Sequence, residues 1–506
     1  MRNSRAMSDT TRTAPRTAAE AVLERYEAVI GIEIHCQLRT ASKMFCGCST
    51  AYDGAAPNTH CCPVCLGLPG ALPVINRQAV EYVITAGVAI GAQVPERTQW
   101  ERKNYFYPDL PKGYQISQYA IPLAAHGQLA IETSAGPFTV EITRAHLEED
   151  TAKLLHGEGG GADRTTLVDF NRSGAPLMEV VTEPTIRTGE QARRYAEELQ
   201  QLLRAIGVSD ADMERGQMRV EANVSLRPRG TKPFGTRVEV KNMNSFRSVE
   251  RAIAYEIERQ GHALDHGEPL VMETRGWDDG RQLTYRMRSK ETSDDYRYFP
   301  EPDLPPLRVA AGWVDAVRAA LPELPAARRA RYASLGLGAY DAAVITADPS
   351  MTAAFEAIAA AGEAPAKEVA NFVTGAHAKA LKAGTANAAG TAGASTPAGI
   401  AALLAAIAGG AVTRQTGREL LDRHLENGTP AEALLAAAGP GPISDDGVLL
   451  AHIDAVIGAN PRAVADHRAG KPVAGFLTGQ VMKATGGAAN AARVTTLVRE
   501  RLDQEG

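Results

Sequence analysis

The chain is short of several features that would each point to a particular class of protein. No stretch approaches the ~20 consecutive apolar residues of a membrane-spanning helix. Neither glycine-rich phosphate loop, GxxxxGK[ST] or GxGxxG, is present in a suitable context. Aromatic residues make up only 5%, and Phe476 is the only one after Pro397. We therefore expect no membrane association, no P-loop or Rossmann nucleotide site, and a small core near the C-terminus.

Cysteine is also rare, and its distribution is informative. Five of the six cysteines lie between Cys46 and Cys65, and Cys36 is close by. Such clustering suits a metal site in a reducing compartment better than a disulfide framework. Cys46-x-Cys48 and Cys62-x-x-Cys65, thirteen residues apart, can supply four thiolates to a tetrahedral Zn²⁺. A structural or redox role is the alternative.

The remaining composition fits an ordinary globular protein of several domains. Hydrophobic residues make up 44% and charged residues 22% of the 506 residues. The net charge of −5 argues against a general nucleic-acid coat but allows a local basic patch. The arginine-containing N-terminus resembles a transit peptide, but Asp9 and Glu20 interrupt the pattern. We expect a disordered tail over residues 1–25 and a cytoplasmic protein.

The segment VIGIEIHCQL, from Val29 to Leu38, alternates as a β-strand does. Successive strand side chains point to opposite faces, so Glu33 and His35 share a face that excludes Ile32 and Ile34. A carboxylate and an imidazole on one face of a rigid strand can bind a cation or share a proton.

A second acidic segment, FTVEITRAHLEED, begins as a strand and ends in Glu148, Glu149 and Asp150. Continued alternation would place Glu149 with Ala145 and Leu147 next to the core, where a carboxylate needs a cation. The alternative is a solvated turn formed by the three acids.

Two further segments are rich in polar and aromatic residues. KNYFYPDLPKGYQISQY, residues 103–119, reads as a loop whose Lys103, Tyr105 and Tyr107 can stack on bases or simply cover the surface. In MRVEANVSL, Glu221 and Asn223 lie on the outer face of a predicted hairpin, which is either a site or the solvated side of an antiparallel sheet.

The amino-acid composition of the chain changes at the proline-rich segment that ends near residue 306. The residues before it predict an α+β domain (26–306) built on a mostly antiparallel sheet with flanking helices. Alanine-rich helical periodicity then predicts a helical domain (307–382), a low-complexity linker (383–397) and a small helical tail domain (398–506). The paired glycines after Lys483 lie between two of these helices.

Several long motifs together resemble one family. These are VIGIEIHCQL, the CxC/CPVCLGLPG cluster, ERKNYFYPDLPKGYQISQY, HLEEDTAKLLH, DFNRSGAPLMEVVTEPT, MRVEANVSLRP, EVKNMNSF, MRSKE…DYRYFPEPDLPPL and GQVMKATGGAAN. They occur in the order seen in the B subunits of the glutamine-dependent aspartyl/glutamyl-tRNA amidotransferases. The resemblance runs from about Tyr26 to the C-terminus, and the linker departs from the family in composition.

The resemblance implies a fold and a reaction. The N-terminal domain would be a cradle similar to glutamine synthetase. ATP would phosphorylate the side-chain carboxylate of Glu-tRNA(Gln) or Asp-tRNA(Asn), and ammonia would then displace the phosphate. An amidase partner, the A subunit, would release the ammonia from glutamine, and a small C subunit would wrap around both chains. This chain lacks an amidase signature, and Cys65 does not lie in a G-x-C-x-G elbow.

The resemblance also assigns residues. Glu33, His35 and Glu149 would bind Mg²⁺ in the catalytic pocket, with Glu148 and Asp150 beside them. Lys103, Tyr105, Tyr107, Glu221 and Asn223 would line the substrate cradle. Cys46, Cys48, Cys62 and Cys65 would bind Zn²⁺, although Cys61 competes with Cys62 for that role. The C-terminal domain, including Lys483, would bind tRNA.

Two other functions remain open from the residues alone. One is a zinc-containing RNA-binding module without catalysis, which leaves Glu33, His35 and Glu149 unexplained. The other is a self-contained ligase that uses free ammonia. The sequence does not say whether Glu-tRNA(Gln), Asp-tRNA(Asn) or both are substrates.

Overall fold

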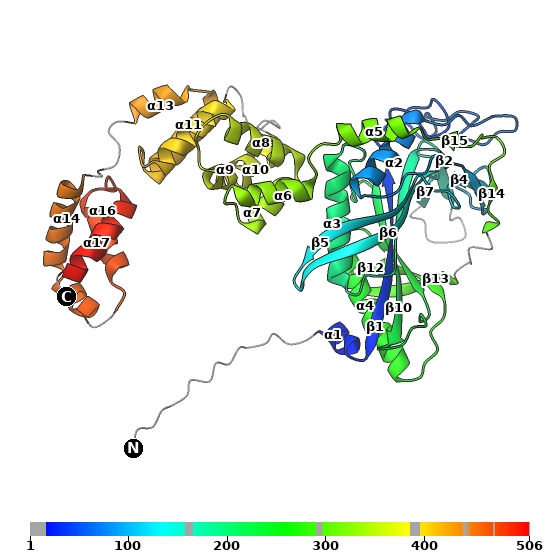
Figure 1. The fold of residues 1–506 in the computed structure, drawn as a ribbon, viewed down its shortest axis with the longest axis horizontal. Coiled ribbons are helices and arrows are strands. Elements are labelled where there is room, and N and C mark those ends of the chain that lie inside the picture. The colour runs from blue at the N-terminus through cyan, green and yellow to red at the C-terminus, as the bar shows by residue number, and fades with distance from the viewer. Residues whose placement is uncertain are drawn as a thin grey trace, which may run out of the picture. The chain divides into compact units, whose positions relative to one another are not determined.

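The computed structural model describes residues 17–156, 165–289, 296–384, 395–438, 443, 445–468 and 471–504. Contacts divide the chain into two compact units that meet in sequence between Leu324 and Pro325 (Figure 1). The first unit is mixed α and β, and the second is helical in its described parts. The predicted α+β class with a helical C-terminal region is confirmed.

The first unit is built on an eight-stranded sheet with the order β13-β12-β11-β10-β1-β9-β6-β5. All neighbouring strands are antiparallel except β11 and β12. The strands are β1 (Tyr26–Gln37), β5 (Ala124–Thr133), β6 (Gly136–Glu149), β9 (Pro176–Thr182), β10 (Met218–Pro228), β11 (Val238–Met243), β12 (Glu273–Asp278) and β13 (Leu283–Ser289).

Short strands form three small sheets, β14-β3-β4, β15-β2 and β7-β8. Their bounds are β2 (Arg97–Thr98), β3 (Glu101–Asn104), β4 (Tyr114–Ser117), β7 (Lys153–His156), β8 (Thr166–Asp169), β14 (Phe299–Pro300) and β15 (Leu307–Arg308). The segment 103–119 was predicted to be a loop. Residues 105–113 form such a loop, whereas residues 103–104 and 114–117 belong to the β3–β4 pair, in which their backbone groups are hydrogen-bonded across the connection.

Helices cover one face of the large sheet. They are α1 (Ala18–Leu23), α2 (Arg77–Ala89), α3 (Gly189–Ala205), α4 (Phe246–Asp265) and α5 (Ala311–Ala320). Ile30, Ile32, Ile34 and Cys36 of β1 are buried in the core with apolar residues of α2, α3 and α4, so the predicted alternation of β1 is confirmed. The intervening side chains of β1 are left for the opposite, polar face.

Residues 17–25 are not part of a disordered tail. Thr17 caps α1, and Glu20 returns the hydrogen bond in a capping box. Val22 is buried in the core, so close to α4 that a Cβ on Gly261 would lie 2.4 Å from a Val22 methyl group. Apolar burial therefore fixes this helix to the first unit. Residues 1–16 lie outside the described residues.

The first unit also extends beyond the predicted boundary at 306. Val309 and Val317 join its hydrophobic core, and Trp313 Nε1 on α5 donates a hydrogen bond of 3.0 Å to Glu81 Oε2 on α2. The prolines near residue 305 mark an irregular connection inside the unit. The unit ends at Leu324.

The described residues of the second unit form two hydrophobic cores. Its helices are α6 (Pro325–Ser334), α7 (Ala339–Ala347), α8 (Pro349–Ala360), α9 (Ala366–Phe372), the π-helix η2 (Val373–His377), α10 (Ala378–Lys382), α11 (Pro397–Ala408), α12 (Arg414–Asn427), α13 (Ala431–Ala437), α14 (Asp446–Ala459), α15 (Pro461–Arg468), α16 (Ala474–Ala484) and α17 (Ala491–Gln504).

The predicted division of this unit at residues 383–397 does not match its cores. Residues 385–394 of that segment lie outside the described residues. Ile400, Leu403 and Leu404 of α11 pack into the same core as Phe355 and Val369, which precede the segment. The second core begins only with Leu449 and joins α14, α16 and α17. Apolar packing thus assigns α11–α13 to the first helical core.

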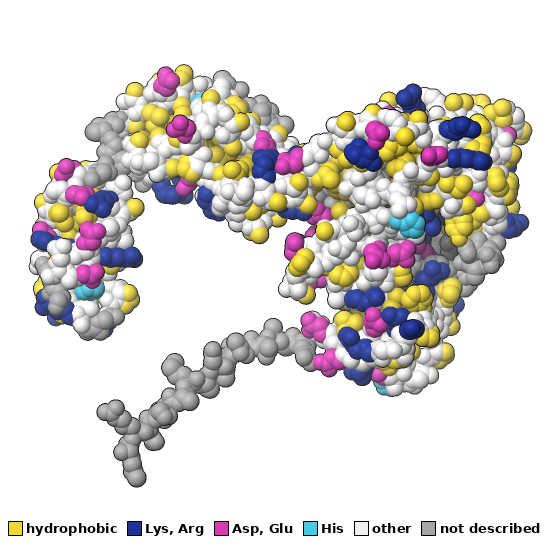
Figure 2. All heavy atoms as spheres, viewed as in Figure 1, with side chains coloured by type: hydrophobic (Ala, Val, Ile, Leu, Met, Phe, Trp, Pro, Cys, Tyr) yellow, Lys and Arg dark blue, Asp and Glu magenta, His cyan; other side chains and the backbone are white. Residues whose placement is uncertain are grey.

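In the view of Figure 2, acidic and basic side chains are interspersed over the described parts of both units. In the described parts of the chain, no helix is both long enough and apolar enough to cross a membrane.

Candidate active site

A row of three titratable side chains crosses the polar face of the large sheet. In the register of the central strands, His35 of β1 lies opposite Glu179 of β9, and Glu179 lies opposite His146 of β6. Directly opposed residues on one face are close enough for their side chains to meet. Glu179 is therefore placed between two imidazoles by strand pairing alone.

Glu148, two residues beyond His146 on β6, completes the group. His35 Nε2 lies 3.4 Å from Glu179 Oε2 and 3.6 Å from Glu148 Oε1. His146 Nε2 lies 3.3 Å from the same Glu179 oxygen and 3.9 Å from Glu148 Oε2. One ligand atom each from His35, Glu148 and Glu179 falls within 4.8 Å of the others, which suits a bound divalent cation.

Burial and neighbouring charges together shift the pKa values of this group. Burial opposes the charged form of His35, but Glu179 and Glu148 outweigh it and raise the pKa of His35 to about 9. Burial and the neighbouring Glu179 raise the pKa of Glu148. Burial disfavours ionised Glu179, yet His146 and His35 outweigh it and lower its pKa well below the usual range. Because a metal-ligating imidazole is neutral, a bound cation would have to replace the proton that the two carboxylates hold on His35.

A cavity of about 460 Å³ opens over this group. Its lining includes the candidate residues His35, Glu148 and Glu179, and the cations Lys103, Arg144, Arg219, Arg237 and Lys241. A polar, mixed-charge cavity of this size can accept phosphate groups together with a divalent cation.

Glu149 does not lie with Glu33 and His35. As alternation predicted, it lies on the face of β6 opposite to Glu148. Its carboxylate pairs there with Lys112 and accepts a 3.0 Å hydrogen bond from the Ile116 N–H. The buried carboxylate has the cation that the sequence argument required, but this cation is a lysine. The predicted Mg²⁺ set of Glu33, His35 and Glu149 is therefore not assembled, and Glu148 takes the place given to Glu149.

Glu33 belongs to a neighbouring acidic group. One carboxylate oxygen each from Glu33, Glu221 and Glu239 lies within 4.8 Å of the others. Lys241 Nζ contacts Glu221 Oε2 at 2.7 Å, and Asn223 Nδ2 donates to Glu33 Oε1 at 2.8 Å. The predicted outer face of the hairpin thus adjoins the site, and Lys241 partly neutralises it.

Of the lysine and two tyrosines predicted to line the substrate cradle from the 103–107 segment, two line the cavity and one does not. Lys103 and Tyr105 line the cavity. Burial opposes the charge of Lys103, but Glu148 outweighs it and the pKa of Lys103 is raised, so the side chain is a cation. Tyr107 is 54% exposed and lies outside the lining of this cavity.

Asp150 belongs to the cavity lining, and its charge is compensated by neighbouring arginines. Arg219 Nη2 lies 3.1 Å and Arg172 Nε 3.5 Å from its carboxylate, and Gln37 Nε2 donates to it at 2.9 Å. Burial opposes ionisation, but Arg219 and Arg172 lower the pKa of Asp150 to about 2. This residue holds strands together at the edge of the cavity.

The cysteines form a compact cluster on the other side of β6. The sulfur atoms of Cys46, Cys48, Cys62 and Cys65 all lie within 4.8 Å of one another, and Cys62 and Cys65 are 3.9 Å apart. Zn–S bonds of ~2.3 Å in a tetrahedron place sulfurs roughly 3.8 Å apart, so the donor set fits Zn²⁺. Cys61 instead points to Asn171 Oδ1, at 4.0 Å.

A fully buried lysine accompanies the thiols. Lys43 Nζ donates to the carbonyl oxygens of His60 (2.7 Å) and Phe170 (3.4 Å) and lies 3.5 Å from Cys65 Sγ. Hydrogen bonding from Cys46 lowers the pKa of Cys65 to about 4, with further help from the Cys62 N–H and Lys43. The cluster is thus set to hold at least one thiolate.

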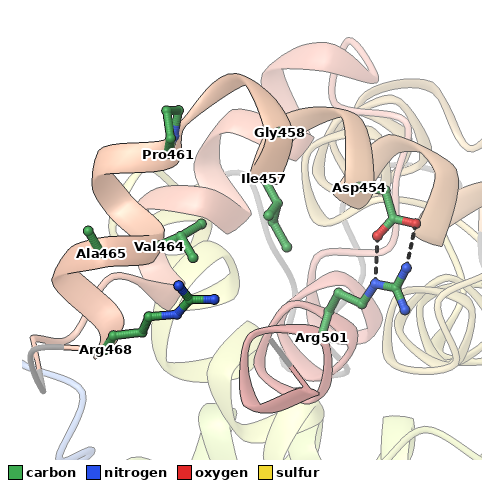
Figure 3. A pocket seen from close by; sticks show the side chains of 8 residues that line it. All are labelled: Asp454, Ile457, Gly458, Pro461, Val464, Ala465, Arg468 and Arg501. Atoms are coloured by element: carbon green, nitrogen blue, oxygen red, sulfur yellow. Dashed lines mark hydrogen bonds and ion pairs between the residues drawn. The ribbon is translucent and has the colours of Figure 1, made fainter. Parts of the chain in front are cut away.

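The second unit contains a separate hollow. A cavity of about 670 Å³ lies among α14, α15 and α17. Figure 3 shows Arg468 and Arg501 reaching toward it, and Arg501 is bound by Asp454 through hydrogen bonds of 2.7 and 2.9 Å. No metal-ligating group was found there among the described residues. Lys483 is exposed in the last turn of α16.

Sequence reasoning named Glu33, His35 and Glu148 but missed Glu179, His146 and Lys112 as site residues. The signal was present in the strand patterns, since LMEVV places one acid among apolar residues and HLE places an imidazole two residues before Glu148. Which strands are neighbours cannot be read from these patterns.

Comparison with known proteins identifies the family. A profile described as the GatB/GatE catalytic domain matches residues 28–315, and one described as the GatB domain matches residues 353–502. The chain belongs to the B-subunit family of tRNA-dependent amidotransferases. The first profile lies within the first unit and contains the cavity, its acidic and histidine residues and the cysteine cluster, and the second lies within the second unit.

Relatives match over nearly their whole length. The B subunit of the aspartyl/glutamyl-tRNA(Asn/Gln) amidotransferase of Moorella thermoacetica is 48% identical over 94% of this chain and 100% of its own. The corresponding protein of Thermomicrobium roseum is 48% identical over 95% and 99%, and that of Carboxydothermus hydrogenoformans 46% over 95% and 99%. The family resemblance expected from the motifs is confirmed.

Proposed function

We propose that this chain is the phosphorylating and transamidating component of an aspartyl/glutamyl-tRNA amidotransferase. The observation that carries the proposal is the convergence of His35, Glu148 and Glu179 in a cavity with Lys103, within a chain of this family. An RNA-binding module without catalysis would leave this buried group unexplained. A self-contained ligase is disfavoured because the relatives are named as subunits.

The proposed reaction has two steps. The γ-phosphoryl group of ATP is transferred to a side-chain carboxylate oxygen of Glu-tRNA(Gln) or Asp-tRNA(Asn), releasing ADP. Ammonia then attacks the acyl carbon, the C–O bond to phosphate breaks, and the amide forms as inorganic phosphate leaves with the proton that ammonia loses. The acyl phosphate is an anhydride, so the cavity must exclude water while admitting ammonia.

His35, Glu148 and Glu179 would hold Mg²⁺, which neutralises phosphate charge during phosphoryl transfer. Lys103 contributes a further buried positive charge at the same cavity. His146 lies 3.3 Å from Glu179 Oε2 and orients that carboxylate. Glu33, Glu221 and Asn223 form the adjoining wall with Lys241, and Tyr105 borders the substrate.

The thiol cluster has a supporting role in this proposal. Cys46, Cys48, Cys62 and Cys65 would bind Zn²⁺ and fix the loop between β1 and α2. The helical second unit, with exposed Lys483, would bind tRNA. The amidase partner would supply ammonia from glutamine, and the small third partner would complete the cytoplasmic heterotrimer.

The test is an assay of the assembled complex. This chain, purified with its amidase and small partners, is incubated with Glu-tRNA(Gln) or Asp-tRNA(Asn), Mg-ATP and either glutamine or ammonium. We expect ADP release that depends on misacylated tRNA, followed by Gln-tRNA(Gln) or Asn-tRNA(Asn). Absence of both phosphorylated and amidated product with the partners present would refute the proposal.

A further inference from the structure

The cations that line the cavity of the candidate active site differ in whether the chain itself supplies their counter-ion. Arg219 contacts Asp150 at 3.1 Å, and Lys241 contacts Glu221 at 2.7 Å. Arg144 of β6 lines the same cavity, but no acid among the described residues forms an ion pair with it. Its Nε atom is buried and has no hydrogen-bond partner in the described part of the chain. A buried N–H group without an acceptor is costly, so a ligand that supplies one would stabilise the site.

The period of the strand places Arg144 beside the candidate catalytic group. Arg144 precedes His146 and Glu148 by two and four residues on β6, so the three side chains share the polar face. In the register with β9, Arg144 lies opposite Val181, two residues from the Glu179 that lies opposite His146. At a rise of ~3.4 Å per residue, the two positions are roughly 7 Å apart along the strand. A long arginine side chain can span this distance.

The Arg144 guanidinium is supported by an aromatic ring. Its Cζ atom lies 5.4 Å from the centroid of the Tyr119 ring, within the ~6 Å of a cation–π contact. The Tyr119 ring in turn stacks on the Tyr298 ring, with a centroid distance of 4.5 Å and an interplanar angle of 15°. A guanidinium held on a ring keeps its N–H edge for a planar acceptor, and arginine binds carboxylates with two parallel hydrogen bonds.

The segment that carries Tyr119 is itself fixed to the sheet. The Tyr119 N–H donates at 2.8 Å to Glu101 Oε2, and the Glu101 carboxylate is buried on β3. The adjacent Gln118 side chain accepts a 3.0 Å hydrogen bond from the Leu147 N–H of β6. Because these hydrogen bonds are buried, they resist competition from water. The ring that supports the guanidinium is therefore held in place before any ligand binds.

The polar face carries other cations at its far end. Lys241 belongs to β11 and Arg237 directly precedes that strand, whereas Arg144 belongs to β6. In the order β11-β10-β1-β9-β6, His35 of β1 and Glu179 of β9 lie between these two ends. Phosphoryl transfer places donor and acceptor roughly in line on opposite sides of the transferred group. Cations at both ends of a metal-binding group suit that arrangement.

We propose that Arg144 binds the side-chain carboxylate of the glutamyl or aspartyl group on the misacylated tRNA, with Tyr119 as its positioning residue. The proposal rests on the proposed function. One carboxylate oxygen stays on the guanidinium, and the other faces the phosphoryl group that it accepts. The single positive charge of Arg144 matches the single negative charge of the carboxylate. This charge pairing is lost in the neutral amide, so Arg144 distinguishes substrate from product.

The test compares three forms of one tRNA bound to the assembled complex without ATP, namely the misacylated substrate, the amidated product and the uncharged tRNA. Arg144→Met removes the charge, and Arg144→Lys keeps the charge without the planar fork. Tyr119→Leu removes the supporting ring, and Tyr119→Phe keeps it. The matched control is Arg77→Met, because Arg77 lies 5.2 Å from the Trp313 ring outside the cavity. Mg-ATP affinity, KM for both substrates and thermal unfolding are measured for each variant.

We expect the wild-type complex to prefer the misacylated tRNA to the amidated product. Arg144→Met should weaken binding of the misacylated tRNA roughly tenfold and raise its KM to a similar extent, because a hydrogen bond to a charged group is lost. Binding of the other two tRNA forms and of Mg-ATP should stay within about threefold, well below that effect. Arg144→Lys should keep part of the preference, and Tyr119→Leu should lose part of it. Tyr119→Phe and Arg77→Met should behave as wild type.

An unchanged preference for the misacylated tRNA in Arg144→Met would overturn the inference. A parallel loss of Mg-ATP affinity would assign Arg144 to the nucleotide, and an equal loss for all three tRNA forms would assign it to the tRNA itself; both results overturn the inference. If thermal unfolding shows that Arg144→Met is not folded, the same preference is measured in Arg144→Lys and Tyr119→Leu.

Failure of the proposed function gives a different result. The wild-type complex would then form no amidated product and would bind the misacylated and amidated tRNAs equally, which overturns the inference as well. Failure of the inference alone leaves a wild-type complex that amidates its tRNA and prefers the misacylated form, with the same preference in Arg144→Met.

Discussion

Glu148 and Glu149 are neighbours on β6 but face opposite sides of the sheet. Glu148 lies with two histidines and a second carboxylate in an open cavity and has no lysine or arginine bound to it directly among its described ion pairs. Glu149 is paired with Lys112 on the side of the cysteine cluster. Under the proposed function, Glu148 takes its cation from solution, whereas Glu149 already has one from the chain. Burial alone does not distinguish a metal ligand from a structural ion pair.

The largest effect is expected from Glu148→Gln. Loss of the carboxylate should weaken binding of Mn²⁺, used as a spectroscopic substitute for Mg²⁺, and reduce phosphorylation roughly 1000-fold. Zinc content should not change. Glu141→Gln, at an exposed carboxylate on the same strand, is the control and should retain activity. Retained phosphorylation in Glu148→Gln would remove this residue from the site.

On the cysteine side, Cys62→Ser should abolish stoichiometric zinc binding, whereas Cys61→Ser should retain it. Of these two residues, only Cys62 belongs to the group of four thiols, because Cys61 points to Asn171 instead. Zinc is measured by elemental analysis of the purified chain and by release to a chromogenic chelator. Equal zinc content in the two variants would show that the cluster is not the zinc site.

Glu149→Gln tests whether the second carboxylate on this strand is a structural ion-pair partner and not a metal ligand. Removing one partner of a buried ion pair leaves Lys112 uncompensated and should lower the free energy of unfolding by about 3 kcal/mol. Affinity for Mn²⁺ should change little, because Glu149 is not in the His35 group. Denaturant unfolding and Mn²⁺ titration separate the two effects. A loss of Mn²⁺ affinity equal to that of Glu148→Gln would restore Glu149 as a ligand.

The smallest effect is expected from Lys43→Met. Four thiolates around Zn²⁺ carry a net charge of −2, and Lys43 is a buried cation 3.5 Å from Cys65 Sγ. Methionine keeps much of the volume and removes the charge, so zinc affinity should fall about tenfold in competition with a chelator. Lys153→Met, at an exposed lysine on β7, is the control. Unaltered zinc affinity would mean that Lys43 serves packing only.

Much of the fold followed from local patterns. Alternation in β1 separated Ile32 and Ile34 from Glu33 and His35. The domain boundaries could not be predicted from local patterns, because the prolines near residue 305 and the low-complexity segment mark only local irregularity. Packing of α5 and α11 into particular cores decides where the units end.

The same distinction applies to the site. By itself the sequence determined that acids, histidines and thiols are present, that Glu33 and His35 share a strand face, and that a buried Glu149 needs a cation. Only the tertiary structure decided that β9 lies between β1 and β6, which brings Glu179 between His35 and His146 and leaves Glu149 to Lys112. A strand's period of two residues determines the face of a side chain, but its partners depend on strand order and register, which are set by contacts distant in sequence.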